Sequence, residues 1–152
     1  MRRFVAVLIV CSFIASGLFW WQQSAARTYQ TAKVSIGDKV TVAVQVAKTS
    51  KQVTQGLSGR QPLGETNGML FVMGASDQWT FWMKDMLFDL DFIWINHGQV
   101  VGVSKQISHP LRGETPATVQ PLIPADQVLE VNAGFVDQYN VQTDDVVRIN
   151  ID

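Results

Sequence analysis

The chain of 152 residues contains one cysteine, Cys11, and it lies within an apolar N-terminal segment. The rest of the chain therefore has no thiol that could form a disulfide or act as a nucleophile. We expect the folded part to be stable through its hydrophobic core alone.

Metal-binding and nucleotide-binding motifs are also missing. The two histidines, His97 and His109, lack the spacing of a zinc motif. No glycine-rich phosphate loop follows a predicted strand, and no serine lies in a Gly-x-Ser-x-Gly context. We therefore expect no metal and no other cofactor, and the catalytic residues, if there are any, stay unknown.

The chain has no marked excess of basic or acidic residues. The 12 basic and 13 acidic residues give a net charge of −1. Without Arg2 and Arg3, 10 basic residues remain against 13 acidic ones, so the rest of the chain carries −3. This balance gives no electrostatic reason to expect nucleic acid as a partner.

The longest uncharged run lies directly after Arg2 and Arg3. Residues 4–21 are 18 uncharged and mostly apolar residues. As a helix they would span roughly 27 Å, close to the bilayer core of about 30 Å. The two arginines would stay on the cytoplasmic side, so the chain after this run is expected to be exported.

Two interpretations of this N-terminal segment remain open. It is either a cleaved signal peptide, with small residues at 24–26 as the cleavage site, or an uncleaved signal anchor, which its length favours. Residues 1–26 then form the signal peptide or anchor, and residues 27–152 form a single globular domain. The expected location is the cell membrane with a periplasmic domain, or secretion if the segment is cleaved, and the only contact with the membrane is through this segment.

Hydrophobic alternation in the exported part predicts a mainly β (α+β) domain. We expect a compact antiparallel barrel-like or rolled sheet with two short helices. Residues 74–77 read as a turn, and residues 107–124, which contain four prolines, read as a long ordered loop without regular structure. The predicted strands cover residues 34–36, 40–46, 68–73, 79–84, 90–95, 100–104, 127–131 and 146–151, and the predicted helices cover about 50–57, ended by Gly59, and 133–139.

Aromatic residues are concentrated in residues 68–95, which hold three of the five tryptophans and four of the eight phenylalanines. We expect this stretch to form the centre of the core, with Trp79 the most exposed of its aromatics. Burying each of Phe81, Phe92 and Trp94 would contribute about 1.5–3 kcal/mol. Charged residues at positions 84, 85, 89 and 91 interrupt the apolar run at close intervals, and charges in such a segment must be paired or lie at the mouth of a cleft.

Several motifs occur in the order of a known family. They are Gln55-Gly56-Leu57 with Arg60, Gly68-Met69-Leu70-Phe71, Phe81-Trp82-Met83-Lys84, Leu90-Asp91-Phe92-Ile93, and Leu129-Glu130 with Ala133-Gly134. With these motifs the chain resembles the bacterial and archaeal family known as domain of unknown function 192. The resemblance implies a compact, mainly β domain that often follows an export signal, but no function. Asp85 stands where the family usually has asparagine, and Asp89 where it usually has proline.

The candidate ligand-binding residues are Lys84, Asp85, Asp91, Glu130 and Trp82. In a binding site, Lys84 would lie at the mouth of a cleft, paired with Asp91 or Glu130, and Trp82 would form a wall. In the structural alternative the same charges form a salt bridge that ties strands together.

Three functions fit these residues. The first is an extracytoplasmic accessory domain, membrane-anchored or secreted, that binds a small molecule, a glycan or an envelope protein. The second is a hydrolase or transferase acting on envelope polysaccharide, with Asp91 and Glu130 as paired carboxylates. The third is a purely structural partner of an envelope protein. The residues leave open whether the protein is an enzyme, and the deciding observation is whether Lys84, Asp91 and Glu130 converge on one cavity.

Overall fold

The computed structural model of the chain describes residues 29–151. The predicted signal or membrane segment, residues 1–26, lies outside the described residues. Within residues 29–151, no helix has both the length and the apolar character needed to cross a bilayer. The described elements are β1 (Gln30–Ile36), β2 (Val40–Ala47), α2 (Ser50–Gln55), β3 (Asn67–Asp77), β4 (Phe81–Trp82), β5 (Leu90–Asn96), β6 (Gln99–Ile107), β7 (Thr118–Val119), β8 (Ala125–Asn132), α3 (Phe135–Gln138) and β9 (Val147–Ile151).

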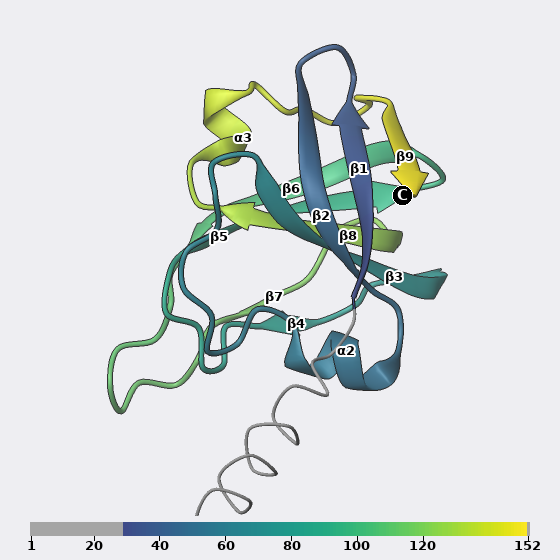
Figure 1. The fold of residues 1–152 in the computed structure, drawn as a ribbon. Helices are drawn as coiled ribbons and strands as arrows, with labels where there is room; N and C mark the ends of the chain where they lie inside the picture. The colour runs from purple at the N-terminus through teal and green to yellow at the C-terminus, as the bar shows by residue number, and fades with distance from the viewer. Residues whose placement is uncertain (1–28, 152) are drawn as a thin grey trace, which may run out of the picture.

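Seven strands form one twisted sheet in the order β6-β5-β8-β3-β2-β1-β9, and β4 pairs separately with β7. The β2–β3 pair is parallel, and the other neighbouring pairs are antiparallel. In Figure 1, β1 and β2 cross in front of β8, as expected for a strongly twisted sheet. Within residues 29–151, an isolated bridge between Gln99 and Val146 is formed beside the two edge strands, but no continuous ladder pairs β6 with β9. The mainly β class with two short helices is therefore confirmed. Of the predicted antiparallel barrel-like or rolled sheet, the barrel and the purely antiparallel pairing are wrong, because the sheet is mixed and forms no closed barrel.

Three local predictions also need correction. The strand β3 continues through the predicted turn to Asp77, with an irregular register between Val72 and Asp77 and a positive φ of 74° at Gly74. The strand predicted at residues 79–84 is only two residues long. The loop predicted at residues 107–124 contains β7, which pairs with β4. Strands of two residues leave no periodicity from which they could be predicted.

Each face of the sheet carries its own hydrophobic cluster. The valine core lies on the face covered by α3, and the aromatic core lies on the face covered by α2 and β4 (Figure 1). Phe81 connects β4 to the sheet, because its ring contacts Phe71 edge-on at 5.0 Å and Trp94 at 5.7 Å between centroids. The aromatic core consists of Ala47, Leu57, Met69, Phe71, Phe81, Met83, Met86, Phe88, Leu90, Phe92, Trp94, Ala125 and Val128; the valine core consists of Ala32, Val34, Ile36, Val42, Val44, Val46, Leu70, Ile93, Ile95, Val100, Leu129, Val131, Phe135, Val136, Val141 and Val147.

The helix α2 is short and sharply bounded at both ends. The Thr49 hydroxyl accepts a hydrogen bond from the Gln52 amide, and the Gln52 side chain accepts one from the Thr49 amide, which is a capping box. Gly56, rather than the predicted Gly59, ends the helix with a φ of 46°. A Cβ at Gly56 would lie 3.3 Å from Cζ of Phe71, so glycine also lets the end of α2 approach the aromatic core.

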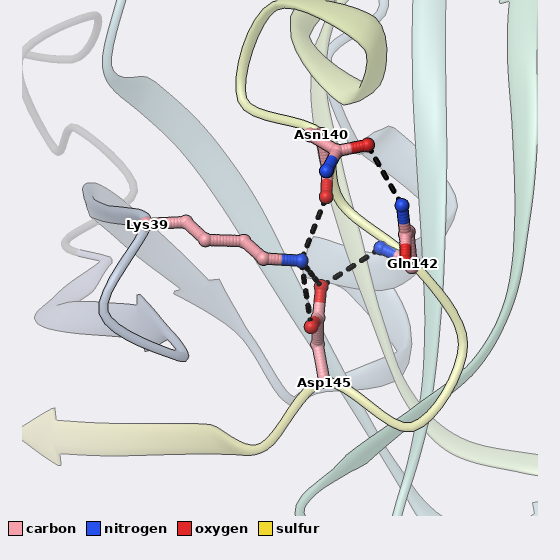
Figure 2. A network of polar contacts seen from close by, with 4 residues as sticks. All are labelled: Lys39, Asn140, Gln142 and Asp145. Carbon is pink, nitrogen blue, oxygen red and sulfur yellow. Dashed lines mark hydrogen bonds and ion pairs between the residues drawn. The ribbon is translucent and has the colours of Figure 1, made fainter.

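A polar network fixes the end of the molecule that lies away from α2 (Figure 2). The ammonium group of Lys39, in the turn between β1 and β2, donates to both carboxylate oxygens of Asp145 at 2.7 Å and to the Asn140 carbonyl at 2.7 Å. The Gln142 amide donates to the same carboxylate at 2.8 Å. These contacts hold the segment between α3 and β9 against the β1–β2 hairpin. The polar groups in the network form their hydrogen bonds with one another.

Candidate functional site

A groove lies between α2 and the short β4–β7 sheet, on the aromatic-core side of the molecule. It encloses a volume of about 270 Å³. Four apolar side chains and three threonines line it, namely Val53, Met73, Phe81, Trp82, Thr54, Thr80 and Thr118. Because side chains alternate along a strand, β4 buries Phe81 in the core and turns Trp82 outward, where 51% of it stays exposed.

Lys84 lies against Trp82, one of the residues that line the groove. The Lys84 ammonium lies over the Trp82 ring, 5.2 Å from its centroid, which is a cation–π geometry. Both side chains are exposed. Among residues 29–151, Lys84 is in no ion pair, so the predicted pairing with Asp91 or Glu130 is absent from the described part of the chain.

The backbone around Lys84 is fixed more firmly than its side chain. The Met86 amide donates to the Met83 carbonyl in a tight turn, and Asp85 in this turn has a positive φ of 57°. Asparagine and aspartate tolerate that conformation better than most residues, so Asp85 keeps the turn where the family usually has asparagine. The Ser58 hydroxyl donates to the Lys84 carbonyl at 2.8 Å and thereby ties the turn to the segment after α2.

Glu130 lies on β8 beneath the aromatic core. The register places it between Met69 of β3 and Phe92 of β5, so all three side chains share one face of the sheet. Glu130 is only 5% exposed. It lines a small cavity of about 30 Å³ that has Val53, Thr54, Phe81 and Trp82 in common with the groove.

The environment of Glu130 favours its neutral form. Burial raises the pKa of this carboxyl group to about 8, and the positive charge of Arg60 opposes the rise only in part. Among residues 29–151 no hydrogen bond to the Glu130 carboxyl is formed. Arg60 itself donates to Gln45 at 2.7 Å, and its guanidinium lies 5.1 Å from the centroid of the Tyr29 ring.

Asp91 is fully buried on the opposite face of the sheet. It pairs across β5 and β8 with Val131, one residue after Glu130, so the two acidic side chains point in opposite directions. One Asp91 oxygen accepts from the Gln106 amide at 2.7 Å, and the other accepts from the Val136 amide at 2.9 Å. Asp91 therefore links α3 to β5 and fixes the end of β6 against the same strand.

Comparison with known proteins agrees with this fold. The profile of the family DUF192, described as "Uncharacterized ACR", matches residues 32–149. The chain belongs to this family. None of the curated proteins matches it.

Two solved structures resemble this DUF192 domain. A protein from Sinorhizobium meliloti 1021, described provisionally as a transcription regulator, has 26% identity and a TM-score of 0.68, with 80% of this chain and 93% of that chain covered. A protein of unknown function from Novosphingobium aromaticivorans DSM 12444 has 27% identity and a TM-score of 0.64, with 78% of this chain and 83% of that chain covered.

The second departure of this DUF192 domain from the family pattern, Asp89, holds the long loop that precedes β7. One Asp89 oxygen accepts from the His109 amide at 2.9 Å and contacts the His109 ring nitrogen Nδ1 at 2.6 Å. The hydrogen bond from the His109 amide has the largest effect and that from the His109 ring the next, and both lower the pKa of Asp89 below its ordinary value. The pair therefore has a local structural role at the start of the loop.

The structure thus brings four of the five predicted site residues to one region. Trp82 lines the groove and the cavity, Glu130 lines the cavity, Lys84 lies over Trp82, and Asp85 follows Lys84 in the turn after β4, whereas Asp91 lies on the opposite face of the sheet. The threonines of the groove and the charge of Arg60 were not predicted as parts of the site, because they come together only through tertiary structure. Among residues 29–151, no group of three or more acidic, histidine or cysteine side chains is placed to hold a metal ion.

Proposed function

We propose that this DUF192 domain is an extracytoplasmic accessory domain that binds the apolar part of a ligand or partner in the groove between α2 and β4. The observation that carries the proposal is the half-exposed Trp82, which stands on the wall of an apolar groove instead of in the core. Exposed large aromatics beside a concave apolar surface are typical of binding sites.

The construction of the groove supports this role. The β4 wall is joined to the core by Phe81, and the turn after β4 is joined to the segment after α2 by the hydrogen bond from the Gly59 amide to the Asp85 carbonyl, so both sides of the groove are fixed to each other. A preformed site loses less conformational entropy when a ligand binds. The hydroxyls of Thr54, Thr80 and Thr118 would give such a site limited polar selectivity.

The other functions are less well supported. A glycosidase-like mechanism needs two carboxylates facing one substrate, whereas Asp91 and Glu130 point to opposite faces. The description of the S. meliloti protein as a transcription regulator would suggest that this domain binds DNA. A net charge of −1, however, gives this chain no general attraction for the phosphate backbone of DNA.

Binding is tested with the full-length chain and a panel of small aromatic and short-chain aliphatic compounds, by saturation-transfer NMR of the compounds. We expect saturation-transfer signals from bound compounds with the original protein and with Val146→Ala, and no such signals with Trp82→Ala. Val146 is the control because it is also an exposed apolar residue but does not line the groove. Equal signals from both variants would contradict a site at the groove.

Location is tested separately. A reporter enzyme that is active only outside the cytoplasm, fused after residue 152, should be active if residues 1–26 direct export. An inactive reporter, with a cytoplasmic reporter active at the same position, would contradict the proposed extracytoplasmic role.

A further inference from the structure

The fold does not explain why residue 130 is an acid. Its neighbours across the sheet, Met69 and Phe92, are apolar, and the aromatic core surrounds it. The Glu130 oxygens form no hydrogen bond among residues 29–151, and they border the small cavity, so they are not among the fully enclosed polar atoms without a partner. A carboxyl group taken this far out of water without a partner still costs free energy of folding, even in its neutral form. Methionine would fill the same space at lower cost, so the acid is better explained by a partner that this chain does not supply from residues 29–151.

The place where such a partner would reach Glu130 is the small cavity. It adjoins the groove, because the two share Val53, Thr54, Phe81 and Trp82. Its volume of about 30 Å³ has room for about one group of the size of a water molecule, whereas the groove has room for about nine. The pair of spaces therefore fits an amphiphile with a small polar head and an apolar body.

The charges near Glu130 decide the chemistry of the head. Arg60 acts on the carboxyl group from the segment after α2, and Lys84 lies over the ring of Trp82, which lines both the groove and the cavity. The neighbouring strands β3 and β5 place only the apolar side chains of Met69 and Phe92 beside Glu130, and α2 places only uncharged side chains in the cavity. The acid in the nearby turn, Asp85, has its side chain exposed to solvent. A ligand with an ammonium head would therefore be repelled by the positive charges of Arg60 and Lys84. A ligand with a neutral oxygen acceptor would not be repelled by them, and among residues 29–151 no acid other than Glu130 lines the cavity.

We propose that Glu130 anchors the ligand of the groove by donating a hydrogen bond from its carboxyl group to a carbonyl or hydroxyl oxygen, while the apolar body of the ligand lies along Trp82. This proposal rests on the binding role proposed above for the groove. A protonated carboxyl group is a donor, and the raised pKa of Glu130 keeps it protonated at neutral pH.

The experiment uses the full-length chain labelled with fluorotryptophan, and the fluorine signal of Trp82 is assigned as the one missing from Trp82→Phe. Hexanamide and hexylamine are the probes, because they share one alkyl chain and differ in the head. Dissociation constants come from titrations of the original protein, of Glu130→Gln, which keeps a donor, and of Glu130→Met, which removes it.

We expect hexanamide to bind the original protein and Glu130→Gln with similar affinity and Glu130→Met about tenfold more weakly, the size of one hydrogen bond. Because the ligand requires the protonated acid, binding to the original protein should weaken as the pH rises through about 8, by about tenfold for one further pH unit. Binding to Glu130→Gln should not depend on pH over this range.

Three results would overturn the proposal, and they can be told apart. Tighter binding of hexylamine than of hexanamide, strengthening with pH, would make Glu130 an anionic site for cations. Equal hexanamide affinity in all three proteins would leave the groove as a binding site and remove Glu130 as its anchor. A Trp82 signal that no probe shifts in the original protein would contradict the binding role of the groove itself, and with it the anchor.

Discussion

The buried acid makes the stability of this protein depend on pH in an unusual direction. Glutamate has an ordinary pKa of 4.5, which we take for the unfolded chain, whereas burial raises the pKa of Glu130 in the folded chain to about 8. Between these values the folded state binds the proton that the unfolded state releases. The stability that the protonated acid contributes is therefore complete below pH 4.5 and is lost as the pH rises towards 8.

The magnitude follows from the width of this interval. At about 1.4 kcal/mol for each pH unit, the interval corresponds to a loss of about 5 kcal/mol for an acid that stays fully buried. Water that enters the small cavity beside the ionised carboxylate would reduce this figure. A loss of this order is a large part of the stability of an ordinary domain.

The assay is urea unfolding of the full-length chain at pH values from 5 to 9, for the original protein and for Glu130→Gln. Glutamine is close to glutamate in shape and does not titrate, so the difference between the two proteins isolates the carboxyl group. We expect the free energy of unfolding of the original protein to fall relative to Glu130→Gln as the pH rises, and to level off above about pH 8. The control is Glu114→Gln, an exposed site, which should follow the original protein at every pH.

Parallel pH curves for the original protein and Glu130→Gln would refute this reasoning. They would mean that Glu130 has the same pKa in both states, and therefore that water or another group compensates its burial. The same result would remove the physical basis for Glu130 as a hydrogen-bond donor at neutral pH.

Three further substitutions test the remaining contacts by urea unfolding. Asp91→Ala should lower the free energy of unfolding by about 4 kcal/mol, because the partly buried amide of Gln106 and the buried amide of Val136 lose their acceptor. A loss below about 1 kcal/mol would contradict the structural role of Asp91. Lys84→Met should lower the free energy of unfolding by less than about 1 kcal/mol, because no acid among residues 29–151 forms an ion pair with Lys84. A loss above about 3 kcal/mol would reveal a buried partner of Lys84. Gly68→Ala should cost about 2 kcal/mol, because its Cβ would lie 2.8 Å from a backbone carbonyl of β8, and an unchanged midpoint would show that β3 and β8 can separate freely.

Local structure was predictable wherever a pattern of side chains repeats. Hydrophobic alternation predicted a strand at residues 40–46, which is β2 in the structure, and the strands predicted at residues 90–95 and 100–104 correspond to β5 and β6, which pair with each other. The burial of Phe81, Phe92 and Trp94 was predicted in the same way. These features depend on residues that are close together in the sequence, so the information needed for them is local.

The arrangement of the strands was not predictable from the same information. The β2–β3 pair is parallel because the chain returns through α2 and a loop before it enters β3, and no residue in either strand specifies that direction. The short β4 and β7 strands lie 38 positions apart at the pair Phe81–Val119, and they stabilise each other only once the sheet exists. Their pairing turns Trp82 outward, so Trp82, rather than the predicted Trp79, is the exposed aromatic of this region.

The candidate site shows why the two buried acids could not be separated by sequence alone. Alternation gives the relative orientation of side chains within β5 and within β8, but the orientation of Asp91 relative to Glu130 depends on the register between the strands. Because Phe92, not Asp91, pairs with Glu130, one acid faces the valine core and the other faces the aromatic core. The first finds two backbone amides and serves the fold, whereas the second finds none among the described residues and lies beside the groove. A shift of register by one residue would have put both acids on one face, and the paired-carboxylate hypothesis would then have had the geometry that it requires.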